Sequence, residues 1–377
     1  MVDKAALQAE AARLQSIFMA AGAEPVDPDL LLPAEMLLDL YGEDIRARAY
    51  VTDDPERGEM MLRPDFTVPI AAMHASMGAG PACYTYTGQV FRKQPVGVGR
   101  PNAYLQVGFE KFDRTAPIKA DAEMFALFSR TLNATTTGAV VGDMGLLLAA
   151  IDTLSTTPTR KAALRRHVWR PRRFRALLDR YTGQTPMPKG RAALIAAVKA
   201  QGATPLIAAA APEIGLRTTQ DIVDRVTALV ADYAVPPISS TEAGVLHTLL
   251  SLRAPLPAAY ERMCDLRADM PGLTPALDQF ATRMEALEQI GIDTTTLYYE
   301  ANFGQTTMEY YDGFVFGFLA PHRPDLPPLA TGGRYDALTR ALGGGAHIVM
   351  PAIGGVIRPD LVLQAMAKTT ADTKGAP

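Results

Sequence analysis

The N-terminal part of the chain alternates apolar and polar residues with the periods of one helix and two pairs of strands. Residues 3–21 carry apolar side chains at helical spacing, which predicts an amphipathic helix. Residues 48–53 and 58–63 flank a turn-rich segment and predict two short strands. Residues 83–92 and 103–112 are rich in Tyr, Val and Phe and flank a loop rich in Pro and Gly. They predict a β-hairpin with a long loop.

The pattern changes in the middle of the chain and later returns. Apolar residues share one face of a helix that we expect over residues 120–133. Residues 156–289 are rich in Ala, Leu and Arg, are broken by Pro and Gly, and predict short helices. From about residue 295 the pattern is strand-like again. Strands, then helices, then strands predict an α+β fold whose sheet is completed across a helical insertion.

Composition narrows the class of protein. A chain of 377 residues suggests about two domains, or one large core with an insertion. Hydrophobic residues make up 48% and charged residues 20%, as in an ordinary soluble protein. The N-terminus has no basic segment before an apolar stretch, and no apolar run approaches the length of a membrane span. We therefore expect a cytoplasmic protein without a membrane segment.

Charge and metal-ligating residues exclude further classes. The net charge of −3 argues against a broad nucleic-acid surface, although a local basic patch is compatible with it. The two cysteines, Cys83 and Cys264, are far apart and lie outside any C-x-x-C pattern, and the five histidines are scattered. We expect no disulfide framework, no metal site and no cofactor.

The predicted hairpin carries the most informative polar residues. Because side chains alternate along a strand, Gln106, Gly108 and Glu110 share one face. Two polar side chains around a glycine form a floor on which a small molecule can lie. Arg92 has the parity to reach that floor from the facing strand. From the hairpin alone, an equally good interpretation is a solvated face with an Arg92–Glu110 ion pair.

Three other segments admit both a structural and a functional interpretation. Asp65 and Thr67 end a strand, and Thr67 is expected to be the N-cap of the next helix in either case. The segment 332–336 precedes a helical run and by itself favours a tight turn that needs glycine. The basic stretch 160–180 favours a solvated helical face, with a protein interface or a phosphate-bearing partner as alternatives.

Taken in order, five segments resemble the catalytic domain of histidyl-tRNA synthetase, a class II synthetase, over residues 1–155 and 290–365. The resemblance implies a class II synthetase-like antiparallel sheet flanked by helices, and a homodimer formed through motif 1. The segments are Leu31–Met36 with Pro33 for motif 1, residues 91–110 for motif 2, residues 309–316 and 331–336 for two histidine-specific motifs, and residues 351–354 for the start of motif 3.

The same resemblance implies a pocket for free histidine. Its positions retain residue types that hydrogen-bond an amino acid and an imidazole. The matched residues are Asp65, Thr67 and Gln106 for the α-amino group, Glu110 and Tyr311 for the imidazole, Arg92 for the carboxylate, and Tyr310 and Tyr335 as walls.

The departures from the synthetase are equally informative. An arginine that helps to form the adenylate falls on Thr306, and the motif 3 arginine that grips ATP falls on Leu361. Arg358 lies three places early, and we expect it to point elsewhere. Neither Thr nor Leu neutralises charge that develops on a triphosphate, and the loss of one such group costs orders of magnitude in rate. We also expect no anticodon-binding domain.

A synthetase-like body with a retained histidine pocket resembles a paralogous family, the regulatory subunits of ATP phosphoribosyltransferase. This resemblance implies a non-catalytic chain that assembles with the short catalytic subunit, with feedback inhibition by histidine and no tRNA or membrane partner. A compact histidyl-tRNA synthetase-like enzyme and a histidine sensor for another partner remain alternatives. The expected organisation is a core in two parts (1–155 and 290–365), a helical insertion (156–289) and a polar tail (366–377).

Overall fold

The computed structural model of the protein describes most of the chain. None of the helices in the described part is long and apolar enough to cross a membrane. Of the expected polar tail, only residues 366 and 367 belong to the described part. The described residues are 3–41, 43–77, 80–94, 101–132, 138–210, 215, 217–303, 310–342 and 350–367.

Within the described residues, one sheet of nine strands forms the centre of the molecule, in the order β1-β5-β6-β12-β11-β10-β7-β9-β8. Neighbouring strands are antiparallel except for the pairs β1–β5 and β7–β9. The expectation of an α+β fold with a largely antiparallel, class II synthetase-like sheet is confirmed. The strands are β1 (Glu24–Pro25), β5 (Ala82–Phe91), β6 (Ala103–Phe112), β7 (Gly138–Asp143), β8 (Arg253–Pro255), β9 (Tyr298–Glu300), β10 (Phe314–Leu319), β11 (Ala330–Arg334) and β12 (Ala352–Ile357).

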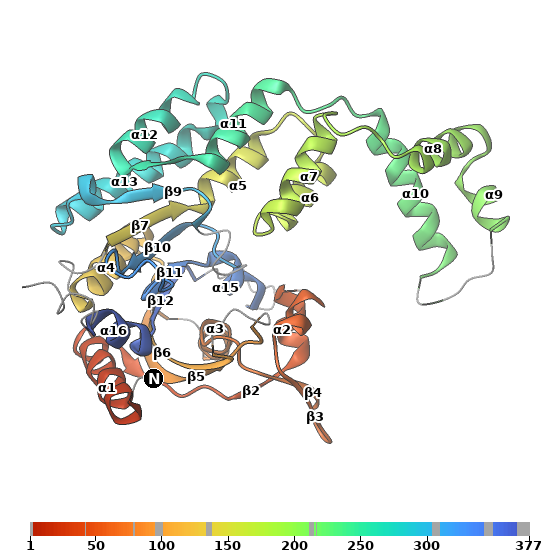
Figure 1. The fold of residues 1–377 in the computed structure, drawn as a ribbon. Helices are drawn as coiled ribbons and strands as arrows, with labels where there is room; N and C mark the ends of the chain where they lie inside the picture. The colour runs from red at the N-terminus through yellow and green to blue at the C-terminus, as the bar shows by residue number, and fades with distance from the viewer. Residues whose placement is uncertain are drawn as a thin grey trace, which may run out of the picture.

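Helices cover both faces of the strands that lie next to the hairpin (Figure 1). On one face Phe18 of α1 (Lys4–Ala20) contacts Phe109 of β6, with ring centroids 5.5 Å apart. Phe18 also contacts Phe128 of α4 (Pro117–Thr131), and α16 (Pro359–Met366) packs beside α1. On the other face lie α3 (Thr67–Ser76) and α15 (Asp336–Leu342). Because side chains alternate along β6, its even-numbered residues point toward α3.

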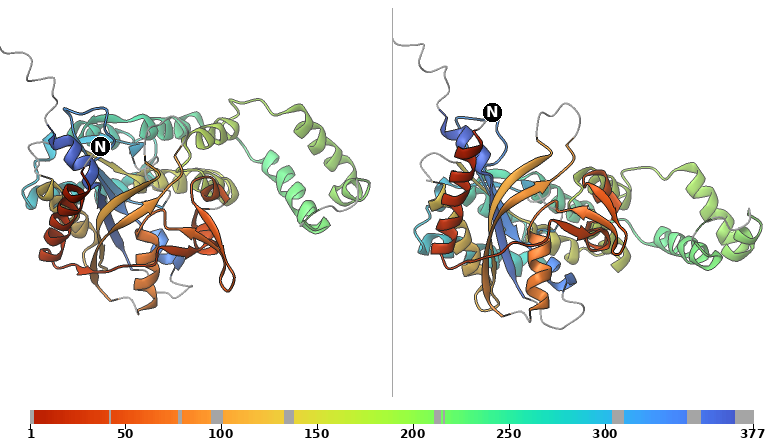
Figure 2. Two further views of the ribbon diagram at one scale, coloured as in Figure 1. Left: turned by 60° about the horizontal axis from the view of Figure 1, so that its bottom comes forward. Right: turned by 90° about the horizontal axis from the view of Figure 1, so that it is seen from below.

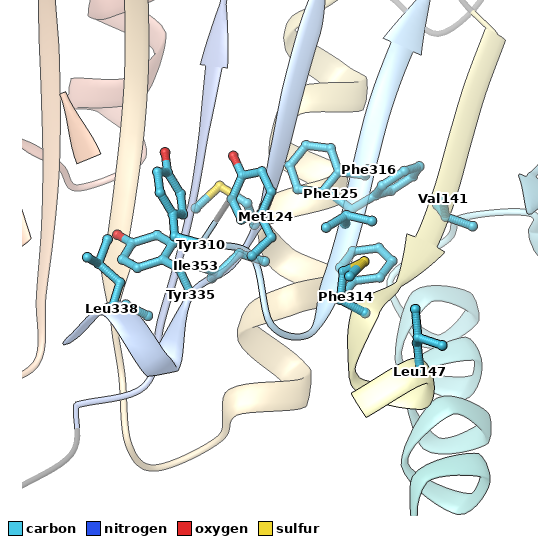
Figure 3. Packing of buried hydrophobic residues seen from close by; sticks show 14 of the residues in the cluster. Met124, Phe125, Val141, Leu147, Tyr310, Phe314, Phe316, Tyr335, Leu338 and Ile353 are labelled. Carbon is cyan, nitrogen blue, oxygen red and sulfur yellow. The ribbon is translucent and has the colours of Figure 1, made fainter. Parts of the chain in front are cut away.

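The core is aromatic where α4 crosses the sheet. Phe125 of α4 lies against Phe316 and Phe318 of β10, with centroid distances of 5.8 and 5.2 Å. Figure 3 shows Phe125, Phe314 and Phe316 close together at this contact, where the rings of Phe125 and Phe316 meet edge to face. A smaller sheet consists of β2 (Leu31–Pro33), β4 (Gly58–Leu62) and β3 (Val51–Asp54). Helix α2 (Ala34–Tyr41) follows β2 directly and packs against β2 and β4.

Residues 156–289 contain two kinds of helices. Helices α8 (Lys189–Gln201), α9 (Ala203–Ala208) and α10 (Thr219–Ala234), here called the projecting helices, extend away from the sheet (Figures 1 and 2). The later part of the segment adjoins the sheet, because β8 pairs with β9 and α13 (Thr274–Gln289) packs on α4. Helix α5 (Met144–Thr153) precedes this region. The remaining helices within it are α6 (Pro158–Arg166), α7 (Pro171–Tyr181), α11 (Ser240–Ser251) and α12 (Leu256–Asp265).

A buried ion network holds α13 to the core. The fully buried carboxylate of Asp121 accepts hydrogen bonds from Arg283 Nε at 2.9 Å and from Arg334 Nη2 at 2.6 Å. Arg283 also pairs with Asp143, and Arg334 with Asp336. Four separate parts of the chain, in α4, β7, α13 and the end of β11, are therefore joined by charges that compensate one another in the interior.

One local expectation from the sequence is wrong. Gly332 and Gly333 lie in strand β11 and not in a tight turn. A Cβ at residue 332 would lie 2.3 Å from Phe316 Cζ, and one at residue 333 would lie 2.8 Å from Tyr311 Cδ1. These glycines are required by the close approach of aromatic rings from neighbouring segments, and not by a left-handed backbone.

Candidate functional site: a cavity between the hairpin and strands β11 and β12

A cavity of about 620 Å³ lies between the β5–β6 hairpin and the strands β11 and β12. Six of the eight residues predicted for the histidine site line it, and the other two, Glu110 and Tyr335, lie fully buried beneath it. Figure 3 shows the rings of Tyr310 and Tyr335 next to each other, and their centroids are 6.0 Å apart. The six lining residues are Asp65, Thr67, Arg92, Gln106, Tyr310 and Tyr311.

Glu110 is the centre of a hydrogen-bonded cluster under the cavity. Its Oε1 accepts hydrogen bonds from Thr67 Oγ1 at 2.8 Å and from the Tyr86 hydroxyl at 3.2 Å. Its Oε2 accepts one from the Tyr335 hydroxyl at 2.7 Å. Complete burial raises the pKa of Glu110 to about 7, although the three hydrogen bonds favour the ionised form. Thr67 therefore connects a carboxyl that titrates near neutral pH to the cavity.

The expected floor over Gly108 is occupied by the protein itself. Tyr86 pairs with Gly108 across the hairpin, and a Cβ at residue 108 would lie 2.1 Å from Tyr86 Cζ. The expectation that a small molecule lies over this glycine is wrong, because a tyrosine ring from the facing strand fills the space. Gln106 lies on the same face of β6 and lines the cavity. Glu110 is buried beneath the cavity, where the hydroxyl groups of Thr67, Tyr86 and Tyr335 donate to it.

Asp65, and not Thr67, caps helix α3. The carboxylate Oδ1 of Asp65 accepts a hydrogen bond from the backbone N–H of Val68 at 3.1 Å. Thr67 is the first residue of the helix, and its hydroxyl donates to Glu110. The predicted N-cap is therefore wrong: Phe66 occupies the N-cap position without a side-chain hydrogen bond, and Asp65, one residue earlier, supplies the capping bond. The Thr67 hydroxyl is directed to the buried carboxylate of β6 instead.

Gln106 presents an unpartnered polar atom to the cavity. Its side chain is 4% exposed, and its Oε1 has no hydrogen-bond partner within the part of the chain that the structure describes. An unpaired buried acceptor costs about 1–3 kcal/mol, so such atoms are found where another donor completes them. The amide oxygen of Gln106 can therefore accept a hydrogen bond from a group that enters the cavity.

Arg92 reaches the cavity from the end of the hairpin. Its Nε donates to the carbonyl of Pro64 at 2.7 Å, and its backbone N–H pairs with Asn102. Glu110 instead lies opposite Tyr84, far along the hairpin. This register rules out the alternative of an Arg92–Glu110 cross-strand pair, and the burial of Gln106 and Glu110 rules out a solvated face.

Arg358 also lines the cavity, which corrects the expectation that it points elsewhere. It follows the last residue of β12, which pairs with Val107 of β6, so its side chain crosses toward Tyr104. The guanidinium carbon lies 4.0 Å from the Tyr104 ring centroid, and Nη2 is 2.7 Å from Asp360 Oδ2. Arg48 and Lys93 line the same opening, and no sequence motif indicated either of them.

Some predicted positions lie outside the described residues, namely Thr306, Glu309 and the central part of the motif 2 loop at 95–100. Leu361 is described and is buried in α16, where it belongs to the hydrophobic core. Its side chain brings no charge to the cavity.

The basic stretch 160–180 is not uniformly solvated. Arg172 and Arg175 are exposed, as expected for a solvated helical face. Arg160, however, is 5% exposed and its Nε lies 2.6 Å from Asp232 Oδ1. Trp169 donates from Nε1 to the carbonyl of Tyr311 at 2.9 Å. Arg160 and Trp169 therefore make structural contacts within the fold. The partner of Trp169, Tyr311, lines the cavity.

Comparisons with known proteins agree with this arrangement. The sequence profile of the histidyl-tRNA synthetase family matches residues 3–236 and 223–361. The ATP phosphoribosyltransferase regulatory subunit of Mesorhizobium japonicum is 30% identical over 373 residues, covering 91% of this chain and 94% of the relative. The protein of the same description from Brucella canis is 30% identical, covering 92% and 93%.

Solved structures show the same fold. A protein from Bacillus halodurans, described as an ATP phosphoribosyltransferase regulatory subunit/histidyl-tRNA synthetase, superposes with a TM-score of 0.65 at 22% identity, covering 97% of this chain and 82% of that one. Histidyl-tRNA synthetase from Nostoc superposes with a TM-score of 0.61 at 14% identity, covering 96% and 72%. The chain belongs to the family of ATP phosphoribosyltransferase regulatory subunits, which is built on the histidyl-tRNA synthetase fold.

Proposed function

We propose that this chain is a non-catalytic regulatory subunit that assembles with the short catalytic ATP phosphoribosyltransferase in the cytoplasm. It enables the first step of histidine biosynthesis and mediates feedback inhibition by histidine. The observation that supports this most is that full-length relatives described as regulatory subunits align with more than nine-tenths of the chain. The cavity supports it further, because it combines a retained polar lining with an unpartnered buried amide oxygen.

Free histidine is the proposed occupant of the cavity. Its α-ammonium group is a donor, and Asp65, Thr67 and Gln106 present acceptor oxygens along one side of the cavity. The unpartnered Oε1 of Gln106 gains a hydrogen bond when the ammonium group binds. A cavity of about 620 Å³ lies within the usual range for small-ligand sites, and it leaves room for ordered water beside an amino acid.

The other end of the ligand is assigned by charge and by the aromatic walls. Arg92 faces the ligand carboxylate, and Tyr310 and Tyr311 enclose the imidazole. Glu110 acts through the hydroxyl groups that it orients, because Thr67 and Tyr335 both donate to it. Tyr335 is buried beneath the cavity and supports the wall that Tyr310 forms, because the two rings are in contact.

Calorimetry with free histidine tests the ligand. Gln106→Leu removes the acceptor while keeping a similar volume, and we expect histidine affinity to fall about tenfold, which is the worth of one hydrogen bond to a charged group. Gln89→Leu is the matched control, because Gln89 is exposed on the same hairpin. Equal histidine affinity in the wild type and in Gln106→Leu would show that Gln106 does not belong to the site. If the wild type does not bind histidine at millimolar concentration, histidine is refuted as the ligand of the cavity.

Mixing this chain with the catalytic subunit tests the assembly. We expect phosphoribosyl transfer to rise and to become sensitive to histidine. If histidine favours one arrangement of the complex, partner binding must change histidine affinity by the same factor. Unchanged activity, with the two proteins eluting separately from a sizing column, would refute the regulatory role and leave a histidine-binding protein with another partner.

The segment around Pro33 is the proposed homodimer interface. Leu30 is 45% exposed and Val51 of the adjoining small sheet is 40% exposed, although both are large apolar residues. Met36 and Leu38 are only partly buried against the core. A second copy of the chain is proposed to cover this surface, since contiguous apolar patches are typical of interfaces.

A compact histidyl-tRNA synthetase-like enzyme is the second candidate, and the position of Arg358 in the cavity favours it. Against it, the Arg358 guanidinium is already paired with Asp360, and Leu361 is apolar and buried. We expect the purified chain to show no histidine-dependent exchange between ATP and pyrophosphate. Measurable exchange would establish this candidate in place of the regulatory subunit.

A further inference from the structure

Trp169, the only tryptophan of the chain, lies in the short connection between α6 and α7. Its indole Nε1 donates a hydrogen bond to the backbone carbonyl of Tyr311 at 2.9 Å. The two residues are 142 positions apart in the sequence, so only the tertiary structure joins them. Tyr311 lines the cavity, whereas Trp169 does not. The indole therefore contacts the back of a cavity wall from the side of the helical insertion.

The carbonyl of Tyr311 needs such a partner. Residues 310–313 belong to neither a helix nor a strand. Two other backbone groups of this segment are bonded to the core, since Asp312 N–H donates to the Arg334 carbonyl at 3.0 Å and the Gly313 carbonyl accepts from Met144 N–H at 2.9 Å. A buried carbonyl outside regular structure requires a donor, and Trp169 supplies it. The Tyr311 wall is thus held from the core on one side and from the insertion on the other.

Helix α6 carries this contact toward the projecting helices. The residues around Trp169 are anchored, because Leu164 and Val168 are fully buried. At the other end of α6, Arg160 Nη1 donates to the Pro236 carbonyl at 2.8 Å and Nη2 donates to the Asp232 carbonyl at 2.7 Å. These carbonyls lie at and just beyond the C-terminal end of α10. A rigid helix therefore links the cavity wall with the base of the projecting helices.

We propose that Trp169 positions Tyr311 in the cavity and transmits the occupancy of the cavity to helices α6 and α7. The proposal rests on the proposed function, in which histidine contacts Tyr311. A ligand that orders the Tyr311 segment also orders the carbonyl that accepts the indole hydrogen bond. By linkage, a change that favours one arrangement of α6 and α7 must in return alter the affinity for histidine, if histidine favours one of those arrangements.

The wild-type chain provides the first test, because its tryptophan emission comes from Trp169 alone. Histidine is titrated while heat and emission are measured on the same sample. We expect a saturable emission change with the midpoint found by calorimetry. Heat without an emission change would overturn the role of Trp169 and leave the histidine site standing. The absence of heat would instead contradict the proposed function, and the inference with it.

The variant Trp169→Phe keeps an aromatic side chain and removes the donor. We expect histidine affinity to fall about threefold to tenfold, as for one neutral hydrogen bond. In the wild type, histidine should slow amide hydrogen exchange in α6 and α7, and in Trp169→Phe this effect should be lost. Arg175→Ala, which changes an exposed residue of α7, is the matched control and should behave as the wild type.

Wild-type affinity together with wild-type exchange in Trp169→Phe would also overturn the proposal. A merely structural role would lower the thermal stability of the variant without removing the response of α6 and α7 to histidine. If Trp169→Phe does not fold, as judged by its thermal unfolding, the emission of the wild-type chain decides.

Discussion

The carboxylate of Glu110 occupies the space that a side chain at Gly354 would take. The two residues are paired across β6 and β12, and a Cβ built at residue 354 would lie 1.5 Å from Glu110 Oε2. The glycine is therefore a condition for burying the carboxylate there. The hydroxyl groups of Thr67, Tyr86 and Tyr335 then complete the cluster.

Gly354→Ala should displace Glu110 and disturb the cavity. We expect the free energy of unfolding to fall by at least about 2 kcal/mol, because overpacking is combined with a displaced buried carboxyl. Histidine affinity should fall with it. Gly244→Ala is the matched control, since Gly244 lies in α11 with no atom near its missing Cβ and the change should stabilise the helix by about 0.5–1 kcal/mol. Chemical denaturation measures both, and equal stability of the two variants would contradict the close contact.

Glu110 should make the fold less stable as the pH rises through neutrality. The unfolded chain loses this proton near the ordinary value of 4.5, whereas burial raises the pKa in the folded chain to about 7. Between these values the folded state binds more protons, so raising the pH lowers the free energy of unfolding, by about 3 kcal/mol at most. Asp312, whose pKa burial raises to about 6, contributes in the same direction.

The variant Glu110→Gln isolates this contribution, because it removes one titrating group and leaves Asp312 in place. The free energy of unfolding is measured by denaturation at several pH values between about 5 and 8. It should depend less steeply on pH in the variant than in the wild type. Identical slopes would mean that Glu110 titrates in the folded protein as it does in the unfolded chain.

Asp121→Asn should lower the free energy of unfolding, because it weakens the packing of α13 on the core. The change leaves Arg283 and Arg334 without the carboxylate that both of them contact, and breaking a buried pair costs about 3–5 kcal/mol. Asp278→Asn is the control, because the Arg267–Asp278 pair lies on the surface and is worth at most about 1 kcal/mol. Thermal unfolding distinguishes the two, and a comparable small effect in both would show that the network contributes little.

Leu30→Asp should weaken the proposed homodimer. A charge in the centre of an apolar interface costs at least about 1.4 kcal/mol, so the dimer dissociation constant should rise about tenfold or more. Sedimentation at several protein concentrations measures it. Met366→Asp changes a residue that is 72% exposed on α16, away from that surface, and should not alter the association. A chain that remains dimeric with Leu30→Asp would move the interface elsewhere.

The local elements were predictable because their signals are local. The periodic apolar residues of 3–21 became α1, and the aromatic runs at 83–92 and 103–112 became the β5–β6 hairpin. Strands β1 and β8 carried no comparable signal, since two or three residues are too short for a period to show. The glycines of β11 misled the prediction, because their cause is a pair of aromatic rings from other segments.

The sequence by itself determined the order of the motifs, and with it the family, the mixed sheet and the residue types available to a ligand. Only the tertiary structure decided that Tyr86 fills the space over Gly108, that Arg358 reaches the cavity, and that Trp169 holds Tyr311. The physical reason is distance along the chain. Periodicity and capping depend on neighbours within a few positions, whereas burial, hydrogen-bond competition and steric exclusion depend on segments that meet only after the sheet has formed.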